Sequence, residues 1–287
     1  MKAILSTWLY VCLYAALSVS QLAAANRADG GNGAADVPVT VRATDETNRQ
    51  LNASVVARTD IQILEHARAA NVEVYDSLQS FVCNEEINRF WGSLNGQTAQ
   101  PLDTVTAKLS FERGVEQYTN VKQDNIPRNG MSSVPGAWSE GEFGTLLLQT
   151  QRLLTTQKVD FESFADLKGE QTARYHFDVS AEDSPWDLSA SGRHYSLPFR
   201  TSVWISVNTG EILKIERATT AIAPETHISQ IQWGITLEHF GINGRTWLLP
   251  ATGSYAVLYN ESRHREWNQM SFTGYQRYGA EASLKFE

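Results

Sequence analysis

Cysteine is scarce in this chain, which has only Cys12 and Cys83 among its 287 residues. Cys12 lies in an N-terminal apolar segment that we expect to be removed, so Cys83 has no partner for an intramolecular disulfide. A chain of this length buries roughly 70–75% of its unfolded surface without covalent cross-links. We therefore expect Cys83 to be a small buried hydrophobic residue rather than a reactive thiol.

Long apolar runs are also lacking, apart from residues 4–19. Lys2 precedes this run and small residues from Ala23 to Ala25 follow it, which is the order found in a secretory signal peptide. The run is shorter than the roughly 20 residues of a membrane-spanning helix, and no basic stop-transfer cluster follows it. We expect residues 1–25 to be a signal peptide, with Ala23 and Ala25 marking the cleavage site. The mature chain should then have no transmembrane segment and reside in the periplasm or outside the cell.

Basic residues are in the minority, with 24 Lys and Arg against 32 Asp and Glu, for a net charge of −8. An acidic chain is a poor partner for nucleic acid or an anionic membrane surface. The sequence has no Walker loop, no Gly-rich dinucleotide fingerprint and no calcium loop. It also has no Cys-x-x-Cys and no pair of histidines four residues apart, the spacings typical of zinc sites. We expect no nucleic-acid partner, no cofactor and no metal.

A catalytic serine motif is missing as well. Residues 137–141 loosely resemble a nucleophile elbow around Ser139, but an elbow needs a strand directly before it and a loop precedes this one. Ser139 and Glu142 instead have the spacing of a capping box at the start of a predicted helix over 140–154. We expect Ser139 to cap that helix, and we expect a non-enzymatic protein with no catalytic residues.

Three segments organise the chain. After the signal peptide, residues 26–57 contain few large apolar groups and are expected to be a flexible leader. Residues 58–287 are expected to form a single domain. A helix over 60–80 opens this domain, because apolar residues recur there every three or four positions and Asp60 is a suitable N-cap.

From residue 82 onward, apolar and polar residues alternate, which is typical of strands with one buried face. Short turns without intervening helices, such as Arg113-Gly114, exclude a parallel βαβ sheet and favour an antiparallel meander. A sheet of so many strands must curl to bury its dry face. We expect a mainly β (α+β) fold, in which a large curved antiparallel sheet forms a half-open barrel and the two helices cover its concave face. The expected strands are 82–91, 104–112, 115–122, 157–164, 171–179, 193–199, 203–207, 212–219, 231–238, 245–249, 252–260, 266–277 and 281–286.

Aromatic residues are abundant on the predicted strands. Core packing explains most such residues, but in a half-open sheet some of them would line an apolar concavity of the kind that binds acyl chains. The candidates for lining a ligand cavity are Trp204, Trp233, Trp247, Tyr255, Tyr259 and Trp267.

Two segments resemble hairpins of the bacterial periplasmic lipoprotein-carrier-like (lipoprotein-sorting-like) family. Residues 203–215, VWISVNTGEILKI, have a Thr-Gly turn and an apolar return strand, and residues 241–250, GINGRTWLLP, are similar to a later hairpin. The segments 81–84 and 141–144 resemble features of an exported bacterial branch of this family. Ser206 departs from the family pattern, in which an acidic residue is usual.

The resemblance covers roughly residues 60–287, and the chain is longer than a typical carrier. It implies an unclosed β-barrel with a helix across its mouth and, in carrier members, a lipoprotein acyl chain held in the cavity. Our leading hypothesis is therefore an exported non-enzymatic protein that binds an apolar or lipid-like ligand. One alternative is an envelope protein–protein interaction module with a filled interior, and another is a secreted hydrolase with a dispersed active site.

Overall fold

The computed structural model describes most of the chain beyond the N-terminal region. The signal peptide with its cleavage site at Ala23 and Ala25, the leader as far as residue 43, the Arg113-Gly114 turn and the strand expected at 281–286 lie outside the described residues. None of the helices in the described part has the length and apolarity needed to cross a membrane. The described residues are 44–78, 81–93, 99–112, 115–135, 139, 141–190, 192–260 and 264–277.

Helix α1 spans Thr44–Leu78, so it begins well before Asp60, where we predicted its start. The helix continues through residues 44–57 of the expected leader because this stretch contains neither glycine nor proline to interrupt it. Asp60 lies inside the helix, where its Oδ1 accepts the Ile61 N–H at 2.8 Å. The chain divides into two compact units, Tyr14–Gln62 and a larger one containing Ile63–Glu287, and the following description concerns the larger unit.

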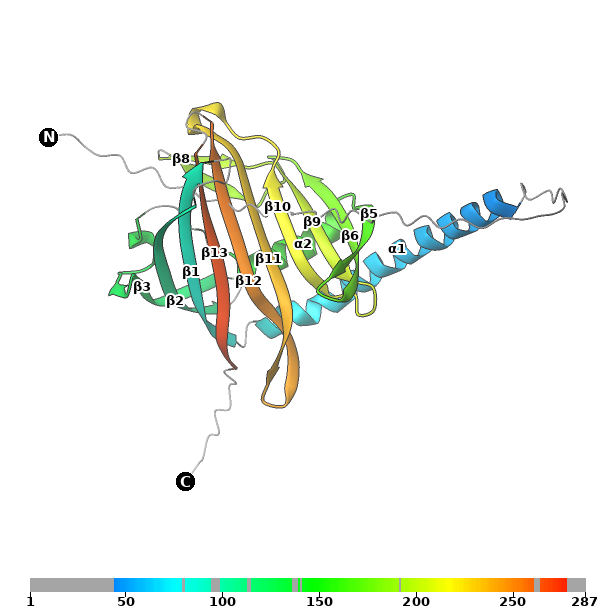
Figure 1. The fold of residues 1–287 in the computed structure, drawn as a ribbon, viewed down its shortest axis with the longest axis horizontal. Helices are drawn as coiled ribbons and strands as arrows, with labels where there is room; N and C mark the ends of the chain where they lie inside the picture. The colour runs from blue at the N-terminus through cyan, green and yellow to red at the C-terminus, as the bar shows by residue number, and fades with distance from the viewer. Residues whose placement is uncertain are drawn as a thin grey trace, which may run out of the picture. The chain divides into compact units, whose positions relative to one another are not determined.

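The larger unit is built on a sheet whose eleven strands, counted in the described part, are all paired antiparallel. Its order is β4-β3-β2-β1-β13-β12-β11-β10-β9-β6-β5, and Figure 1 shows these strands side by side. The bounds are β1 Phe81–Ser93, β2 Gln100–Glu112, β3 Val115–Gln123, β4 Ile126–Pro127, β5 Asp160–Leu167, β6 Glu170–Val179, β9 Phe199–Ser206, β10 Ile212–Thr219, β11 Ile228–Ile242, β12 Arg245–Tyr259 and β13 His264–Arg277. A separate hairpin pairs β7 (Asp187–Ala190) with β8 (Arg193–Ser196).

The sheet is not closed into a barrel, since β4 and β5 stand at opposite ends of the strand order. This confirms the predicted mainly β fold with a large open antiparallel sheet and two helices. Several strand bounds differ from the prediction, β4 and β7 were not predicted, and in two places the division into strands changes. The strand expected at 193–199 is divided between β8 and β9, and those expected at 245–249 and 252–260 are one strand, β12. A bulge at Ala251 shifts the alternation inside β12, which makes one strand look like two in the sequence.

The alternation predicted for the strands produces one strongly buried face. We call the face that carries Leu109, Val203, Ile215 and Phe272 the inner face, and the opposite side the outer face. Helix α2 (Thr145–Thr156) packs on the inner face with one side of its surface. The buried residues on that side of α2 are Leu146, Leu147, Thr150, Leu153 and Leu154.

The start of helix α2 corrects the predicted capping box. Its N-cap is Gly144 and has no side-chain cap, while Ser139 has a buried Oγ without a hydrogen-bond partner. Glu116 on β3 supplies the acceptor instead, receiving the N–H groups of Phe143, Gly144 and Thr145 at 3.1, 2.9 and 3.2 Å on Oε1. A carboxylate at a helix N-terminus satisfies the free N–H groups and the helix dipole together, so a distant strand replaces the local motif.

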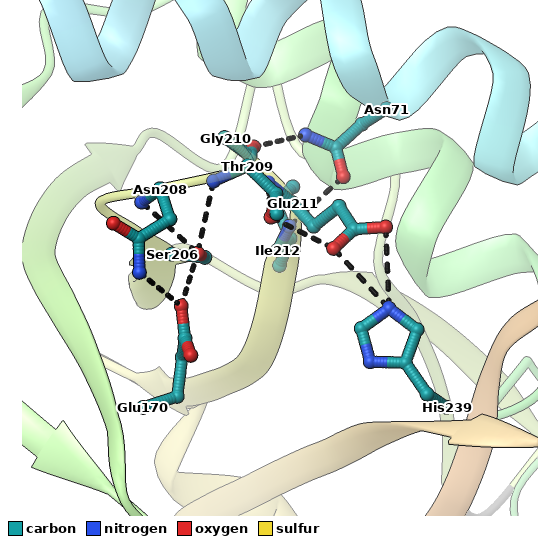
Figure 2. A network of polar contacts seen from close by, with 9 residues as sticks. All are labelled: Asn71, Glu170, Ser206, Asn208, Thr209, Gly210, Glu211, Ile212 and His239. Atoms are coloured by element: carbon teal, nitrogen blue, oxygen red, sulfur yellow. Dashed lines mark hydrogen bonds and ion pairs between the residues drawn. The ribbon is translucent and has the colours of Figure 1, made fainter.

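The larger unit's part of α1 is joined to the β9–β10 hairpin through one buried amide. Asn71, with 0% exposure, donates to the Gly210 carbonyl at 3.0 Å and accepts the Ile212 N–H at 2.9 Å (Figure 2). Gly210 has a φ of +74°, and a Cβ there would lie 2.9 Å from the His66 ring. The turn therefore needs glycine both for its backbone conformation and for its close approach to the helix.

We expect the substitution Asn71→Ala to lower the free energy of unfolding by about 2–4 kcal/mol, because it leaves two buried backbone groups without partners. Urea unfolding followed by circular dichroism measures this difference. The control is Val72→Ala on the same helix, where the side chain is 48% exposed and the loss should stay below about 0.5 kcal/mol. Equal losses for the two variants would contradict the role assigned to Asn71.

Candidate functional site

The inner face of the sheet is apolar and rich in aromatic side chains. Tyr175 and Phe177 on β6, Phe199 on β9 and Phe272 on β13 are almost fully buried. Phe143, which precedes α2, packs on Phe272 with ring centroids 6.1 Å apart. The layer between α2 and the sheet is therefore made of apolar and aromatic side chains, a chemistry suited to contact hydrocarbon.

Arg217 is a buried cation within this apolar surface. Arg217 lies two residues after Ile215 on β10, so its side chain points to the same, inner face. Only 2% of Arg217 is exposed. Its Nε donates to Thr201 Oγ1 at 3.3 Å and its Nη1 donates to Gln149 Oε1 on α2 at 3.0 Å. Its Nη2 is buried and has no hydrogen-bond partner in the part of the chain that the structure describes. An unsatisfied buried donor of this kind costs about 1–3 kcal/mol, so the position is not explained by packing alone.

Aromatic rings surround the guanidinium. The Arg217 Cζ lies 4.1 Å from the ring centroid of Phe199 and 5.7 Å from those of Trp186 and Trp233. Cation–π contacts offset part of the cost of removing the charge from water. Burial lowers the pKa of Arg217 to about 9, so the side chain keeps its charge at neutral pH.

Buried carboxylates lie further along the inner face. Glu85 on β1 has 1% exposure and an Oε2 without a hydrogen-bond partner. Burial, followed by the nearby charges of Glu142 and Glu116, raises the pKa of Glu85 well above its usual range. Glu142 accepts the indole N–H of Trp233 at 3.0 Å, and Glu116 accepts the Tyr118 hydroxyl at 2.8 Å. Glu85 is therefore held in its neutral form over a wider pH range than an exposed glutamate.

The raised pKa of Glu85 makes stability fall as pH rises. The unfolded chain loses the Glu85 proton near pH 4.3, whereas the folded chain keeps it to a higher pH. The contribution of Glu85 to the free energy of unfolding therefore declines by about 1.4 kcal/mol per pH unit between its pKa in the unfolded chain and its pKa in the folded chain. We expect Glu85→Gln to remove this decline. Urea midpoints of Glu85→Gln and wild type should therefore diverge as pH rises from 5 to 8. The control is Glu86→Gln at the exposed neighbouring residue, whose urea midpoints should differ from those of wild type by the same amount at every pH. A difference between Glu85→Gln and wild type that does not change with pH would contradict the raised pKa of Glu85.

Three of the six aromatic candidates share the inner face. Trp233 and Tyr255 are direct partners across β11 and β12, and Tyr259 follows Tyr255 on the same side of β12. Burial raises the pKa of the Tyr259 hydroxyl. Trp247 packs edge-on against the fully buried Phe81, with centroids 5.3 Å apart, where the chain leaves α1.

The other two candidates lie on the outer face. Trp204 is the partner of Lys214 across β9 and β10, and its ring lies under Lys214 at 4.5 Å and Arg174 at 4.7 Å. Trp267 stacks on Phe90 with centroids 5.4 Å apart. The structure does not bring these two rings together with Trp233.

Sequence reasoning missed Arg217 and its surroundings. The signal was present, because Arg217 falls on the apolar phase of the predicted strand 212–219, where a charge is out of place. Cys83 behaves as predicted, since it is a free buried cysteine and burial raises the pKa of its thiol. Ser139 Oγ has no hydrogen-bond partner among the described residues.

A groove of about 440 Å³ lies where the β5–β6 and β9–β10 turns meet β11. Its carboxylates are already engaged: Glu170 accepts Ser206 Oγ at 2.6 Å and Glu211 lies 3.3 Å from the His239 ring nitrogen (Figure 2). Ser206 on β9 thus lies beside the Glu170 carboxylate of the neighbouring strand β6. This network links the β9–β10 hairpin to β6 and β11.

No family model and no curated protein matches this chain. Among solved structures, it is similar to an outer membrane lipoprotein-sorting protein domain from Vibrio parahaemolyticus, with a TM-score of 0.39 and 10% identity over 77% of this chain and 93% of that one. It is also similar to a DUF1329 family protein from Desulfovibrio piger, with a TM-score of 0.36 and 8% identity over 77% and 95% of the two chains. A third similar structure is the lipoprotein LppX of Mycobacterium tuberculosis, with a TM-score of 0.27 and 12% identity over 77% and 98%.

Proposed function

We propose that this protein is an exported, non-enzymatic binding protein whose inner face holds the apolar part of a lipid-like ligand. The observation that carries the proposal is the inner face itself, an aromatic-rich surface on an unclosed sheet that α2 covers. Burying apolar area contributes about 25 cal/mol per Å², so a hydrocarbon chain between α2 and the sheet would be held without any specific motif. A lipoprotein acyl chain is one ligand of this chemistry.

Within this proposal, Trp233 and Tyr255 are the ligand contacts of the inner face, and Tyr259 and Trp247 lie nearer its ends. Trp204 and Trp267 are on the outer face and would not touch the ligand. The carboxylates Glu85 and Glu142 are buried among apolar groups. An apolar, aromatic-rich face of this kind supports the binding of an apolar ligand.

Tryptophan fluorescence tests the side of the sheet on which a ligand binds. We expect lauric acid to change the tryptophan emission of the wild-type protein, and the substitution Trp233→Phe to remove at least about half of that change, because an indole at the site reports the loss of water around it. The matched control Trp204→Phe removes an outer-face indole and should leave the change intact. An emission change that disappears in Trp204→Phe and persists in Trp233→Phe would contradict binding at the inner face.

Mass spectrometry of lipid extracted from the protein purified from its native envelope gives an independent test. The proposal expects a stoichiometric amphiphile, displaced by a fluorescent fatty-acid probe. Failure to find lipid together with failure to bind the probe would overturn the proposal, and it would favour an interaction module with a filled interior.

A further inference from the structure

Two arginines on the inner face are equally buried but differ in their partners. Arg89 on β1 has 2% exposure and forms an ion pair with Asp103, to which its Nε donates at 2.5 Å. Arg217 is also 2% exposed, but no carboxylate among the described residues pairs with it. A buried cation is normally compensated by an anion, so the structure satisfies this requirement at Arg89 and leaves it open at Arg217.

The groups around Arg217 satisfy only some of the N–H donors of its guanidinium and supply no negative charge. Thr201 and Gln149 are neutral acceptors that engage Nε and Nη1, and Phe199 covers one face of the guanidinium at 4.1 Å. The Nη2 group keeps its N–H bonds unused. An acceptor atom carrying negative charge would complete this set, because charge-assisted hydrogen bonds are the stronger kind.

Two half-buried side chains lie beside the guanidinium. Gln149 belongs to α2 and Trp186 precedes the β7–β8 hairpin. Both contact Arg217, at 3.0 Å for the Gln149 hydrogen bond and 5.7 Å for the Trp186 ring centroid.

We propose that Arg217 binds the carboxylate of a fatty-acid-like amphiphile, with the hydrocarbon chain lying along the inner face past Trp233. This inference rests on the proposed function and adds the chemical class of the ligand. The acid group takes the unused Nη2 N–H bonds, and the three aromatic rings enclose the first methylenes of the chain.

The surroundings favour a group with a single negative charge. Arg217 supplies one positive charge, and Glu142 is bonded to the same Trp233 that flanks the guanidinium. A phosphate monoester carries about −1.5 to −2 charges at neutral pH, which one cation beside a glutamate does not balance. A carboxylate carries one charge and matches the planar guanidinium.

The experiment compares three ligands that share one hydrocarbon chain: lauric acid, dodecanol and dodecyl phosphate. Each displaces a fluorescent fatty-acid probe from the wild-type protein, from Arg217→Met and from the control Arg174→Met. Arg174 is a matched control because it stacks on an aromatic ring, Trp204, but on the outer face. Urea unfolding verifies that each variant is folded, and replacing an unpaired buried cation by methionine is expected to preserve the fold.

The wild type should bind laurate at least about tenfold more tightly than dodecanol, which corresponds to about one unit in log Kd. Arg217→Met should lose this preference and keep its affinity for dodecanol within about threefold, while Arg174→Met should behave as wild type. The wild-type preference for laurate is itself a test that needs no variant.

The other outcomes separate the two proposals. If wild type binds none of the three ligands, the proposed function fails. If wild type binds laurate and dodecanol equally, or if Arg217→Met keeps the preference, the proposed function stands and the role of Arg217 is overturned. Tighter binding of dodecyl phosphate than of laurate would overturn the carboxylate assignment.

Discussion

The position of helix α2 over the sheet depends on one contact, the Glu116 carboxylate at its N-terminus. This side chain receives backbone N–H groups from Gly141 to Thr145, which would otherwise be unpaired at the start of the helix. Because Glu116 belongs to β3, the contact ties the helix to the sheet rather than to its own flanking loop. It thereby brings Gln149 over Arg217 and defines the space in which a ligand would lie.

The charged groups at the inner face are compensated in different ways. The carboxylates of Glu116 and Glu142 accept hydrogen bonds, and Arg89 has its aspartate. Glu85 lacks a partner for one oxygen and avoids the cost of a buried charge by keeping its proton. Arg217 cannot avoid the cost of a buried charge in this way, because it stays protonated at neutral pH. Because the acid can become neutral and the strong base cannot, Arg217 is the residue of this face that points to an anionic ligand.

The two faces of the sheet use aromatic residues differently. On the outer face, the ring of Trp204 is covered by Arg174 and the ring of Trp267 by Arg265. On the inner face, Trp233 donates its N–H to a buried glutamate and its ring flanks a buried arginine. Tryptophan therefore stacks with arginine side chains on the outer face and lines the candidate site on the inner face.

The sequence by itself determined the antiparallel sheet, its apolar face and the two helices, because alternation and helical periodicity are local properties of neighbouring residues. Glu85 is buried and Glu86 is exposed because adjacent strand residues point to opposite faces. Only the tertiary structure decided that α2 is capped by Glu116 and that Arg217 lacks an anion. These contacts join residues far apart in the chain, and their partners are selected by how the sheet curves and where α2 lies, which no local pattern encodes.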